Sequence, residues 1–346
     1  MDRQDITLLK TSSMKSIMPQ WQSLYDSNQD LLPFSSYEYC KREKVQYLGY
    51  LVSKMEWPVF FLFSEKVTGR PLMLAPLTYS LKRRCWQTFG NITGCAAVDF
   101  LYPSDMDEET MRTCLGMLLE HCGKIRFSRF DAGSLALKVI REQVPDLEMK
   151  GNELVNIQFG DSFDEYFAHL SKHVRQNVRT AYNRVQRDNL SVIFHSYSPT
   201  WTCPDYGKCL DVFTKRQTTA IGKSLLGLHF IKNWSIRYFK NDTFSLRDMD
   251  CTYLSELKFS KDGPVAAALF AFRDRKGDRI IVPRLAINSD YGFYSPGLIL
   301  VAETIKDLQK GFVRNLDLSR GSEKYKFDMG GEPYYTYQFV LQSGKE

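Results

Sequence analysis

The chain has 346 residues, of which 43% are hydrophobic and 14% are aromatic, and its formal net charge is +6 at pH 7. This length accommodates two domains of ordinary size, and the apolar content excludes an intrinsically disordered chain. The positive charge permits an anionic ligand but is too small to indicate nucleic acid as a partner. We therefore expect a folded protein without a DNA partner.

The eight cysteines lack the paired spacing of a metal-binding motif, and the five histidines belong to no CxxC…H pattern. Cys203 and Cys209 in particular have no second pair, so we predict reduced thiols and no metal. Residues 1–10 lack the apolar core of a signal peptide, and no run of 18 apolar residues occurs. Free thiols without a signal favour the cytoplasm, and we expect no transmembrane segment.

The first half of the chain alternates strand and helix signals. Its apolar and Gly-rich patterns predict strands at 58–63 and 72–79 around a turn at 68–70, a helix at 109–122, and a strand through Phe127 and Phe130. A domain boundary is expected near 149–153, which divides the chain into residues 1–152 and 153–346. The second part begins with a predicted strand at 153–159 and a helix from 163 to about 187. A loop at 196–205 and helices at 206–220 and 228–239 follow.

Residues 172–187 contain five Lys or Arg residues and no Asp or Glu. Apolar residues recur every three or four positions in this segment, which predicts one buried stripe: Val174, Val178, Ala181 and Val185. Arg175 and Arg179 are four residues apart and share a neighbouring face. Two guanidinium groups on one face suit a phosphate or carboxylate ligand, and they equally suit a solvated face that tolerates charge.

Residues 265–326 read as strand, turn, strand, Ser-Pro-Gly loop, helix, strand and polar cluster. The turn is at 275–278, the loop Tyr294–Gly297 opens a helix at 298–310, and Leu316 lies in the next strand. A strand that leads through a short loop into a helix N-terminus creates an anion site from free backbone N–H groups. The polar residues 317–326 are expected beside that site.

The first half repeats this order in weaker form, which predicts two diverged copies of one αβ unit. The strand at 58–63 corresponds in this interpretation to the strand from Val265, and the strand at 72–79 corresponds to 280–288. The segment from the turn to the last strand is longer in the first half, and it lacks a Ser-Pro-Gly loop. The alternative is coincidence, because short strands and Gly turns recur in α/β proteins.

Three stretches in register resemble the cellulose-biosynthesis-type branch of the GNAT N-acetyltransferase superfamily, which is related to the Fem-type peptidyltransferases. They are LSKHVRQNVR at 170–179, YSPGL at 294–298 and LDLSRGSEKYK at 316–326. PFSSYE at 33–38 also resembles the N-terminal helix start of that family. The resemblance covers residues 160–330 most clearly.

The resemblance implies an α/β (α+β) fold of tandem acyl-CoA N-acyltransferase (GNAT-like) domains, with mixed central sheets flanked by helices. Residues 1–152 would be a degenerate half, and residues 153–346 would bind acyl-CoA, with acetyl-CoA expected first. The cofactor-binding residues implied are the backbone of Leu285, Ala286 and Ile287 for pantetheine, and Tyr294, Ser295 and Gly297 for pyrophosphate. The loop departs from the usual pattern because it has one Gly where that pattern has more.

Acyl transfer from a thioester requires a base for the acceptor and a proton for the departing thiolate. Glu323 and Asp317 are the candidate bases, and Tyr325 occupies the region of the usual thiolate acid in GNAT enzymes. Lys326 is the candidate for binding an acidic substrate or stabilising charge.

Each candidate has a structural alternative. Asp317 would brace the turn at 320–321, Glu323 would pair with Arg175 or Arg179, and Tyr325 would be core packing. Arg175, Arg179 and Arg320 are the predicted substrate-binding residues, the first two for an anionic group of the acceptor or for the cofactor phosphates.

The function implied is a cytoplasmic acyltransferase of polysaccharide biosynthesis, which moves an acyl group from acyl-CoA to an amine or hydroxyl of a sugar, amino-sugar or surface-polymer precursor. The acceptor would be a small molecule or polymer precursor. One alternative is a Fem-type transferase that uses aminoacyl-tRNA, although no extended heptad pair for a coiled-coil arm occurs. Another is a catalytically silent scaffold. Tyr334, Tyr335, Tyr337 and Phe339 alternate as in a final strand.

Overall fold

The computed structural model describes residues 1–42, 55–89, 95–224 and 246–343, without the side chains of 217–224. The predicted helix at 228–239 lies outside these residues. The chain divides into two compact units, and each is described here by itself. The first consists of Met1–Glu153 and Tyr335–Glu346, and the second is Leu154–Tyr334.

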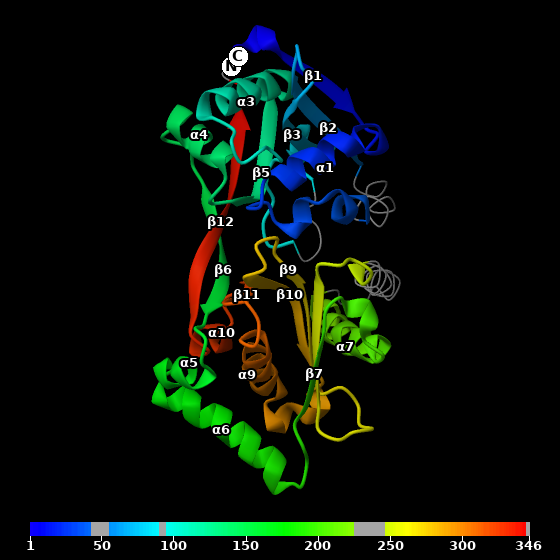
Figure 1. Cartoon of the computed structure of the whole chain (residues 1–346), viewed down its shortest axis with the longest axis vertical. Coiled ribbons are helices and arrows are strands. Elements are labelled where there is room, and N and C mark those ends of the chain that lie inside the picture. The colour runs from blue at the N-terminus through cyan, green and yellow to red at the C-terminus, as the bar shows by residue number, and fades with distance from the viewer. Residues whose placement is uncertain (43–54, 90–94, 225–245, 344–346) are drawn as a thin grey trace. The chain divides into compact units, whose positions relative to one another are not determined.

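The described strands of the first unit form one mixed sheet (Figure 1). Their order is β1 (Ile6–Thr11), β2 (Glu56–Glu65), β3 (Pro71–Ser80), β4 (Cys85–Thr88), β5 (Lys124–Asp131) and the later part of β12 (Gly331–Gln342). Neighbours are antiparallel except β4 and β5, which are parallel. A parallel pair needs a crossover, and α3 (Glu108–Cys122) lies in it.

The other helices whose bounds lie wholly within the described part of the first unit are short. They are η1 (Arg3–Asp5), η2 (Lys15–Ile17), α1 (Met18–Ser27), η3 (Pro33–Ser35) and α4 (Leu135–Gln143). Side-chain caps fix two helix starts: Asp107 accepts from the backbone N–H of Thr110 at α3, and Ser134 accepts from Ala136 at α4. The segment 33–38, which resembles a helix start, begins as η3 and continues into helical residues 37–42.

The described strands of the second unit follow the same scheme (Figure 1). Their order is β7 (Ile193–Tyr197), β8 (Thr252–Lys258), β9 (Ala267–Arg273), β10 (Arg279–Ile287), β11 (Asn315–Arg320) and β6 (Lys150–Gln158). Neighbours are antiparallel except β10 and β11, which are parallel with α9 (Pro296–Leu308) in the crossover. The fold is therefore mixed α/β, as predicted.

The two units share one succession of strands, so the predicted repetition is present in the topology. The predicted correspondence, however, was wrong by one strand. Each parallel pair with its crossover helix fixes the match, so β4 and not β3 corresponds to β10. The sequence gives little signal for β4, because this strand has four residues and almost no periodicity. The longer spacing predicted for the first half arose from the omission of β4.

The predicted helix from 163 to about 187 is two helices, α5 (Phe163–His169) and α6 (Lys172–Arg187). Leu170 has an extended backbone, and the Ser171 side chain accepts a hydrogen bond from the N–H of Val174. Serine at this position caps a new helix and so competes with continuation of the old one. The predicted stripe of α6 is buried.

Helices cover the strands of the second unit on both sides (Figure 1). α6 packs on α9, and α9 packs on β8 and β9, so α9 is buried almost all round. α7 (Tyr206–Ser224) packs on β9 and β10 from the other side, and its predicted start at 206 is confirmed. The short elements η4 (Thr200–Thr202), η5 (Ser289–Tyr294) and α10 (Lys324–Asp328) lie in the connections.

Each of the eight cysteines is a free thiol. Within residues 1–42, 55–89, 95–224 and 246–343, no helix combines the length and the apolar character needed to cross a membrane.

Gly331 is a test of how tightly α10 is held against β6. A Cβ atom at this position would lie 2.4 Å from Val155 Cγ1 and 2.6 Å from the Lys326 carbonyl oxygen. The latter is backbone and cannot rotate away, so Gly331→Ala should lower the free energy of unfolding by about 2 kcal/mol in urea titrations. Gly160→Ala is the matched control, since nothing lies within 4 Å of its added Cβ. Equal stability of the two variants would contradict this packing.

Candidate functional site

β10 and β11 run side by side for three residue pairs and then diverge. Their register is Arg279 with Asn315, Ile280 with Leu316 and Ile281 with Asp317. Beyond these pairs β10 follows β9 to Ile287, with a register shift after Ile281, and β11 follows β6. The β11-side edge of β10 therefore has no pairing strand in the described part of the chain after Ile281.

The alternation of the backbone decides which groups lie on this open edge. The N–H of Asn288 donates to the Ala266 carbonyl at 2.8 Å, so it faces the β9 side. Because successive residues of a strand direct their hydrogen-bonding groups to opposite edges, Ala286 also faces β9, whereas Leu285 and Ile287 face the open edge. Of the three predicted pantetheine contacts, the structure thus places two on the open edge and turns Ala286 into the sheet.

The loop before α9 lies against the end of this edge. Ser295 has a left-handed backbone (φ 51°, ψ 52°), and its side chain caps no N–H of α9. Pro296 occupies the first helical position, and the first turn contains no acidic residue. A Cβ atom on Gly297 would be 3.2 Å from Ile287 Cγ2, so glycine permits the close approach of loop and strand. The uncapped helix N-terminus therefore adjoins the open edge.

Two arginines of α6 contact the same loop. Arg184 Nη1 donates to the Phe293 carbonyl at 2.8 Å, and its guanidinium lies 4.7 Å from the Phe293 ring centroid. Arg187 lies 5.7 Å from that ring and pairs with Asp188 at 3.0 Å. Asp188 also accepts from the Tyr294 hydroxyl at 2.9 Å, which raises the pKa of Tyr294, while Arg187 lowers the pKa of Asp188.

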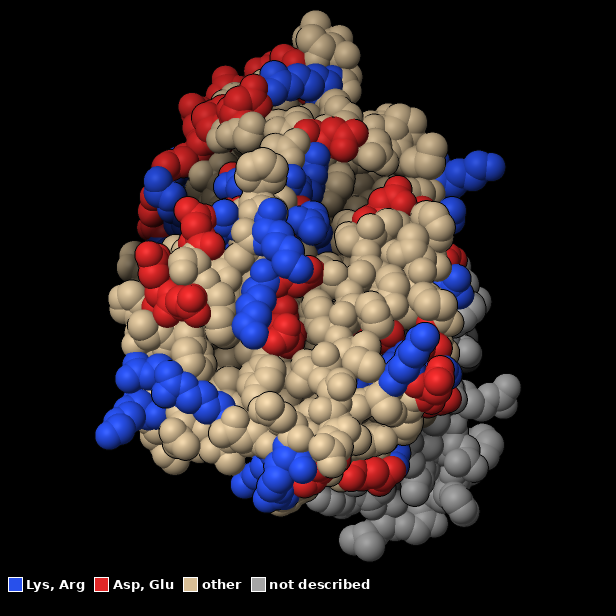
Figure 2. Space-filling model, turned by 60° about the horizontal axis from the view of Figure 1, so that its bottom comes forward, with Lys and Arg blue, Asp and Glu red and all other residues tan. Residues whose placement is uncertain are grey.

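The arginines predicted from spacing lie at the other end of α6. Arg175 Nη1 donates to the carbonyls of Ala168 and Leu170 and so ends α5, and the Arg179 guanidinium stands over Phe167 at 5.7 Å. Spacing identifies a shared face but not which turn of a helix about 24 Å long meets a distant loop. On the face shown in Figure 2, Lys and Arg side chains stand in separate groups, several of them beside Asp or Glu.

Asp317 faces the interior at the end of its pairing with β10. It is 1% exposed, its Oδ1 accepts from the Ser319 N–H at 2.7 Å, and its Oδ2 accepts from the Tyr334 hydroxyl at 2.5 Å. Burial raises the pKa of Asp317, and the Tyr334 hydrogen bond opposes that shift. Ser319 has a left-handed backbone (φ 53°), which the Asp317 contact supports. Asp317 thus shapes the bend that follows β11.

Lys326 holds the loop after β11 from within. Its ammonium group is buried and donates to the carbonyls of Leu318, Arg320 and Gly321 at 2.9, 2.7 and 3.0 Å. Its Nζ also lies 3.0 Å from Glu323 Oε2. Burial lowers the pKa of Lys326, and the hydrogen bond and charge of Glu323 oppose that shift. The lysine that was predicted to meet substrate is therefore directed into the loop.

Glu323 and Tyr325 lie nearer the open edge. The Glu323 side chain is 45% exposed and stands between Lys326 and Arg216, whose guanidinium is 3.9 Å away, so Arg175 and Arg179 are not its partners. Burial and the Glu323 charge raise the pKa of Tyr325 to about 12, and Arg216 opposes the shift. Arg216, from α7, also donates to the Leu285 carbonyl.

Arg216 had not been predicted as a site residue. No local motif marks it, because only the packing of α7 on β10 brings it to the edge. Glycine is favoured at position 321 because its backbone (φ 106°) lies in the region that side chains rarely adopt. The structure therefore brings together the open edge of β10, the α9 N-terminus, Glu323, Tyr325 and Arg216.

Comparison with known proteins relates part of this chain to a family. Residues 172–327 match the family described as acetyltransferase (GNAT) domain. A comparison with curated protein sequences found no match. Among solved structures, FemX is 10% identical with a TM-score of 0.57, covering 96% of this chain and 97% of that chain.

Two further structures are similar over nearly their whole length. The C-terminal domain of a protein designated a lysylphosphatidylglycerol synthetase from Agrobacterium fabrum has a TM-score of 0.55 at 10% identity, covering 96% of this chain and 93% of that one. A conserved protein of unknown function from Bacteroides thetaiotaomicron has a TM-score of 0.51 at 9% identity, with 96% and 99% covered. At these identities the likeness concerns the fold alone. Residues 172–327, which lie in the second unit, thus match an acetyltransferase (GNAT) domain, and the fold of the chain resembles that of FemX.

Proposed function

We propose that the second unit transfers an acyl group from acyl-CoA, acetyl-CoA first of all, to an amine or hydroxyl of a sugar, amino-sugar or surface-polymer precursor. One observation supports this above the others. The edge of β10 loses its β11 partner after Ile281, and the uncapped N-terminus of α9 meets that edge at Ile287 and Gly297. An amide-containing arm that ends in a pyrophosphate matches both features.

The donor would lie along the open edge of β10. The amides of pantetheine need backbone partners, which Leu285 and Ile287 offer, and a pyrophosphate needs N–H donors and positive charge, which the α9 N-terminus and Arg184 offer. The Leu285 carbonyl accepts from Arg216 in this structure. Donor binding through that carbonyl would therefore displace the guanidinium.

Glu323 and Tyr325 suit the two proton transfers. The partly exposed Glu323 carboxylate would accept the proton of the acceptor as it attacks the thioester carbonyl. A phenol whose pKa is raised to about 12 stays protonated near neutral pH, so Tyr325 would supply a proton to the departing thiolate. We assign Asp317 and Lys326 to shaping the loop, because both are buried and engaged.

The exposed Arg320, which follows the bend of β11, remains the proposed contact for an anionic acceptor. Arg175 and Arg179 lie away from the loop that would hold the phosphates, so their proposed ligand is the acceptor and not the cofactor.

The fold shared with FemX favours a second candidate, the Fem-type transfer of an aminoacyl group from aminoacyl-tRNA. In that case the class of acceptor and the two proton transfers would be those of the first candidate, and only the donor would differ. Calorimetric titration with acetyl-CoA, longer acyl-CoAs and aminoacyl-tRNA separates the two. Binding of aminoacyl-tRNA together with no heat from any acyl-CoA would replace the first candidate by the second.

Charge reversal at the two ends of α6 should affect the Kd for acetyl-CoA differently. Arg184→Glu places a carboxylate at the α9 loop and should raise the Kd for acetyl-CoA roughly tenfold, about 1.4 kcal/mol in binding free energy. Arg179→Glu, on the same helix, should leave that Kd unchanged, and Ser295→Glu should weaken binding as Arg184→Glu does. Titration calorimetry measures all three. Equal Kd values for the Arg184 and Arg179 variants would contradict this placement of the phosphates.

Glu323→Gln should lower kcat roughly 100- to 10,000-fold, because the amide cannot accept the proton. The Kd for acetyl-CoA and the melting temperature should stay unchanged, since the carboxylate is half exposed. Glu332→Gln provides a control at another exposed carboxylate of the same unit. If the Glu323→Gln protein is unfolded or keeps full turnover, Glu323 has a structural role and is not the base.

Lys326→Met should destabilise the protein by about 3 kcal/mol, because three loop carbonyls and Glu323 lose a buried cation. Lys324→Met is the matched control: it removes the same group two residues away, where the ammonium is 80% exposed and pairs with Asp328. Its cost should be within about 0.5 kcal/mol. Urea unfolding followed by circular dichroism measures both. If the Lys326→Met protein is stable but has no turnover, Lys326 takes part in catalysis and does not merely hold the loop.

A further inference from the structure

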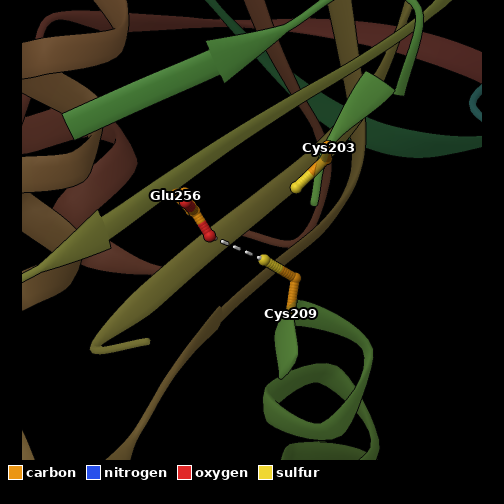
Figure 3. A group of neighbouring side chains, drawn as sticks. All are labelled: Cys203, Cys209 and Glu256. Atoms are coloured by element: carbon orange, nitrogen blue, oxygen red, sulfur yellow. Dashed lines mark hydrogen bonds between the residues drawn. The ribbon is translucent and has the colours of Figure 1, made fainter. Parts of the chain in front are cut away.

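Two cysteines and a glutamate converge in the second unit, away from the α9 loop. The Sγ atoms of Cys203 and Cys209 and a carboxylate oxygen of Glu256 all lie within 4.8 Å of one another, and all three residues are buried. Figure 3 shows the three side chains directed toward a common point, with Cys209 Sγ donating to Glu256 Oε2 at 3.4 Å. None of these residues belongs to the proposed acyl-transfer site.

The three side chains come from separate elements. Cys203 follows η4, Cys209 is in the first turn of α7, and Glu256 is in the middle of β8. A thiolate in the first turn of a helix is stabilised by the helix dipole.

His195 stands beside Glu256 at the open side of this cluster, outside the three residues whose ligand atoms all lie within 4.8 Å of one another. His195 of β7 is directly opposite Glu256 in the antiparallel register, so both side chains lie on one face of the sheet. His195 Nδ1 is 3.6 Å from Glu256 Oε1, and the imidazole is 52% exposed. In a tetrahedral zinc site with ligand bonds of about 2.0 to 2.3 Å, ligand atoms lie roughly 3.3 to 3.8 Å apart. The His195–Glu256 separation falls in this range.

Two neighbouring side chains hold the Glu256 carboxylate in place, as hydrogen-bonding neighbours do for metal-binding carboxylates. Tyr197 donates its hydroxyl to Glu256 Oε1 at 3.2 Å, and the Lys258 ammonium lies 3.5 Å from the same oxygen. Lys258 also pairs with Asp205, so it retains a partner when the Glu256 carboxylate turns to a metal. The exposed His195 leaves a route for an ion to enter.

We propose that Cys203, Cys209 and Glu256 hold a Zn²⁺ ion, and that the exposed His195 turns toward the ion to complete a tetrahedral site. Two thiolates with an imidazole and a carboxylate form a donor set that suits zinc better than hard cations, which prefer oxygen ligands. Four protein ligands leave no open position for substrate, so the ion has a structural role. It ties the start of α7 to β7 and β8, and α7 carries Arg216 to the open edge of β10.

The test uses the full-length chain, reduced and freed of metal by a chelator, and then titrated with Zn²⁺ or with Co²⁺ as a spectroscopic probe. We expect one metal ion bound per chain and a thiolate-to-cobalt charge-transfer absorption that zinc abolishes. Free zinc at about 100 times its Kd should raise the melting temperature by roughly 5 °C. Binding should weaken as pH falls, because protons compete for the thiolates.

Variants distinguish this site from adventitious thiol binding. Cys203→Ser and Cys209→Ser should each abolish the charge-transfer band or halve it, His195→Gln should lower the zinc affinity, and Tyr197→Phe should lower it roughly 10- to 100-fold. Cys251→Ser, at a partly exposed cysteine outside the cluster, should bind as the unmodified chain does. The half-exposed His195 keeps the test informative if a cysteine variant fails to fold.

Three results would overturn the proposal. They are no metal uptake by the reduced chain, unchanged zinc affinity in both His195→Gln and Cys209→Ser, and a Cys203–Cys209 disulfide as the stable state under conditions in which zinc is offered in excess.

Discussion

The early end of the pairing between β10 and β11 is the constraint on which the rest of the second unit depends. Backbone N–H and C=O groups at a sheet edge require partners, and β11 supplies them only as far as Asp317. Beyond that point the edge of β10 is left to side chains and ligands. The crossover helix α9 starts at the end of this edge, with Gly297 against Ile287. The parallel pair therefore opens beside a helix N-terminus, which is the arrangement on which the proposed donor site rests.

The loop after β11 carries two charged residues, Lys326 and Glu323, whose exposure to solvent differs. Lys326 is buried beneath the loop and satisfies its carbonyls, whereas Glu323 lies above it, partly exposed, between Lys326 and Arg216. A buried cation with several carbonyl partners fixes backbone, and an exposed carboxylate beside cations is available for proton transfer. Residues three apart in one polar cluster thus have different surroundings, because one faces the interior and the other is partly exposed.

Local patterns predicted the elements wherever a periodicity or a cap was strong. The buried stripe of α6, the Ser-Pro-Gly start of α9 and the alternating C-terminal strand all hold in the structure. Prediction failed where a local competition was decisive. Ser171 caps a new helix and divides the predicted long one, and the short β4 escaped notice, which displaced the alignment of the two repeats. The resemblance to GNAT proteins is confirmed for residues 172–327.

The sequence by itself determined the fold class, the repeat and the Ser-Pro-Gly start of α9, because each depends on residues near one another in the chain. Only the tertiary structure decided which side chains meet. It brought Arg184 rather than Arg175 to the α9 loop and Arg216 to the Leu285 carbonyl. It likewise joined Cys203 and Cys209 to a glutamate nearly fifty residues away, where spacing had indicated isolated thiols. The physical reason is that hydrogen-bonding and ligand geometry depend on distances through space, which strand register and helix packing set and local spacing does not.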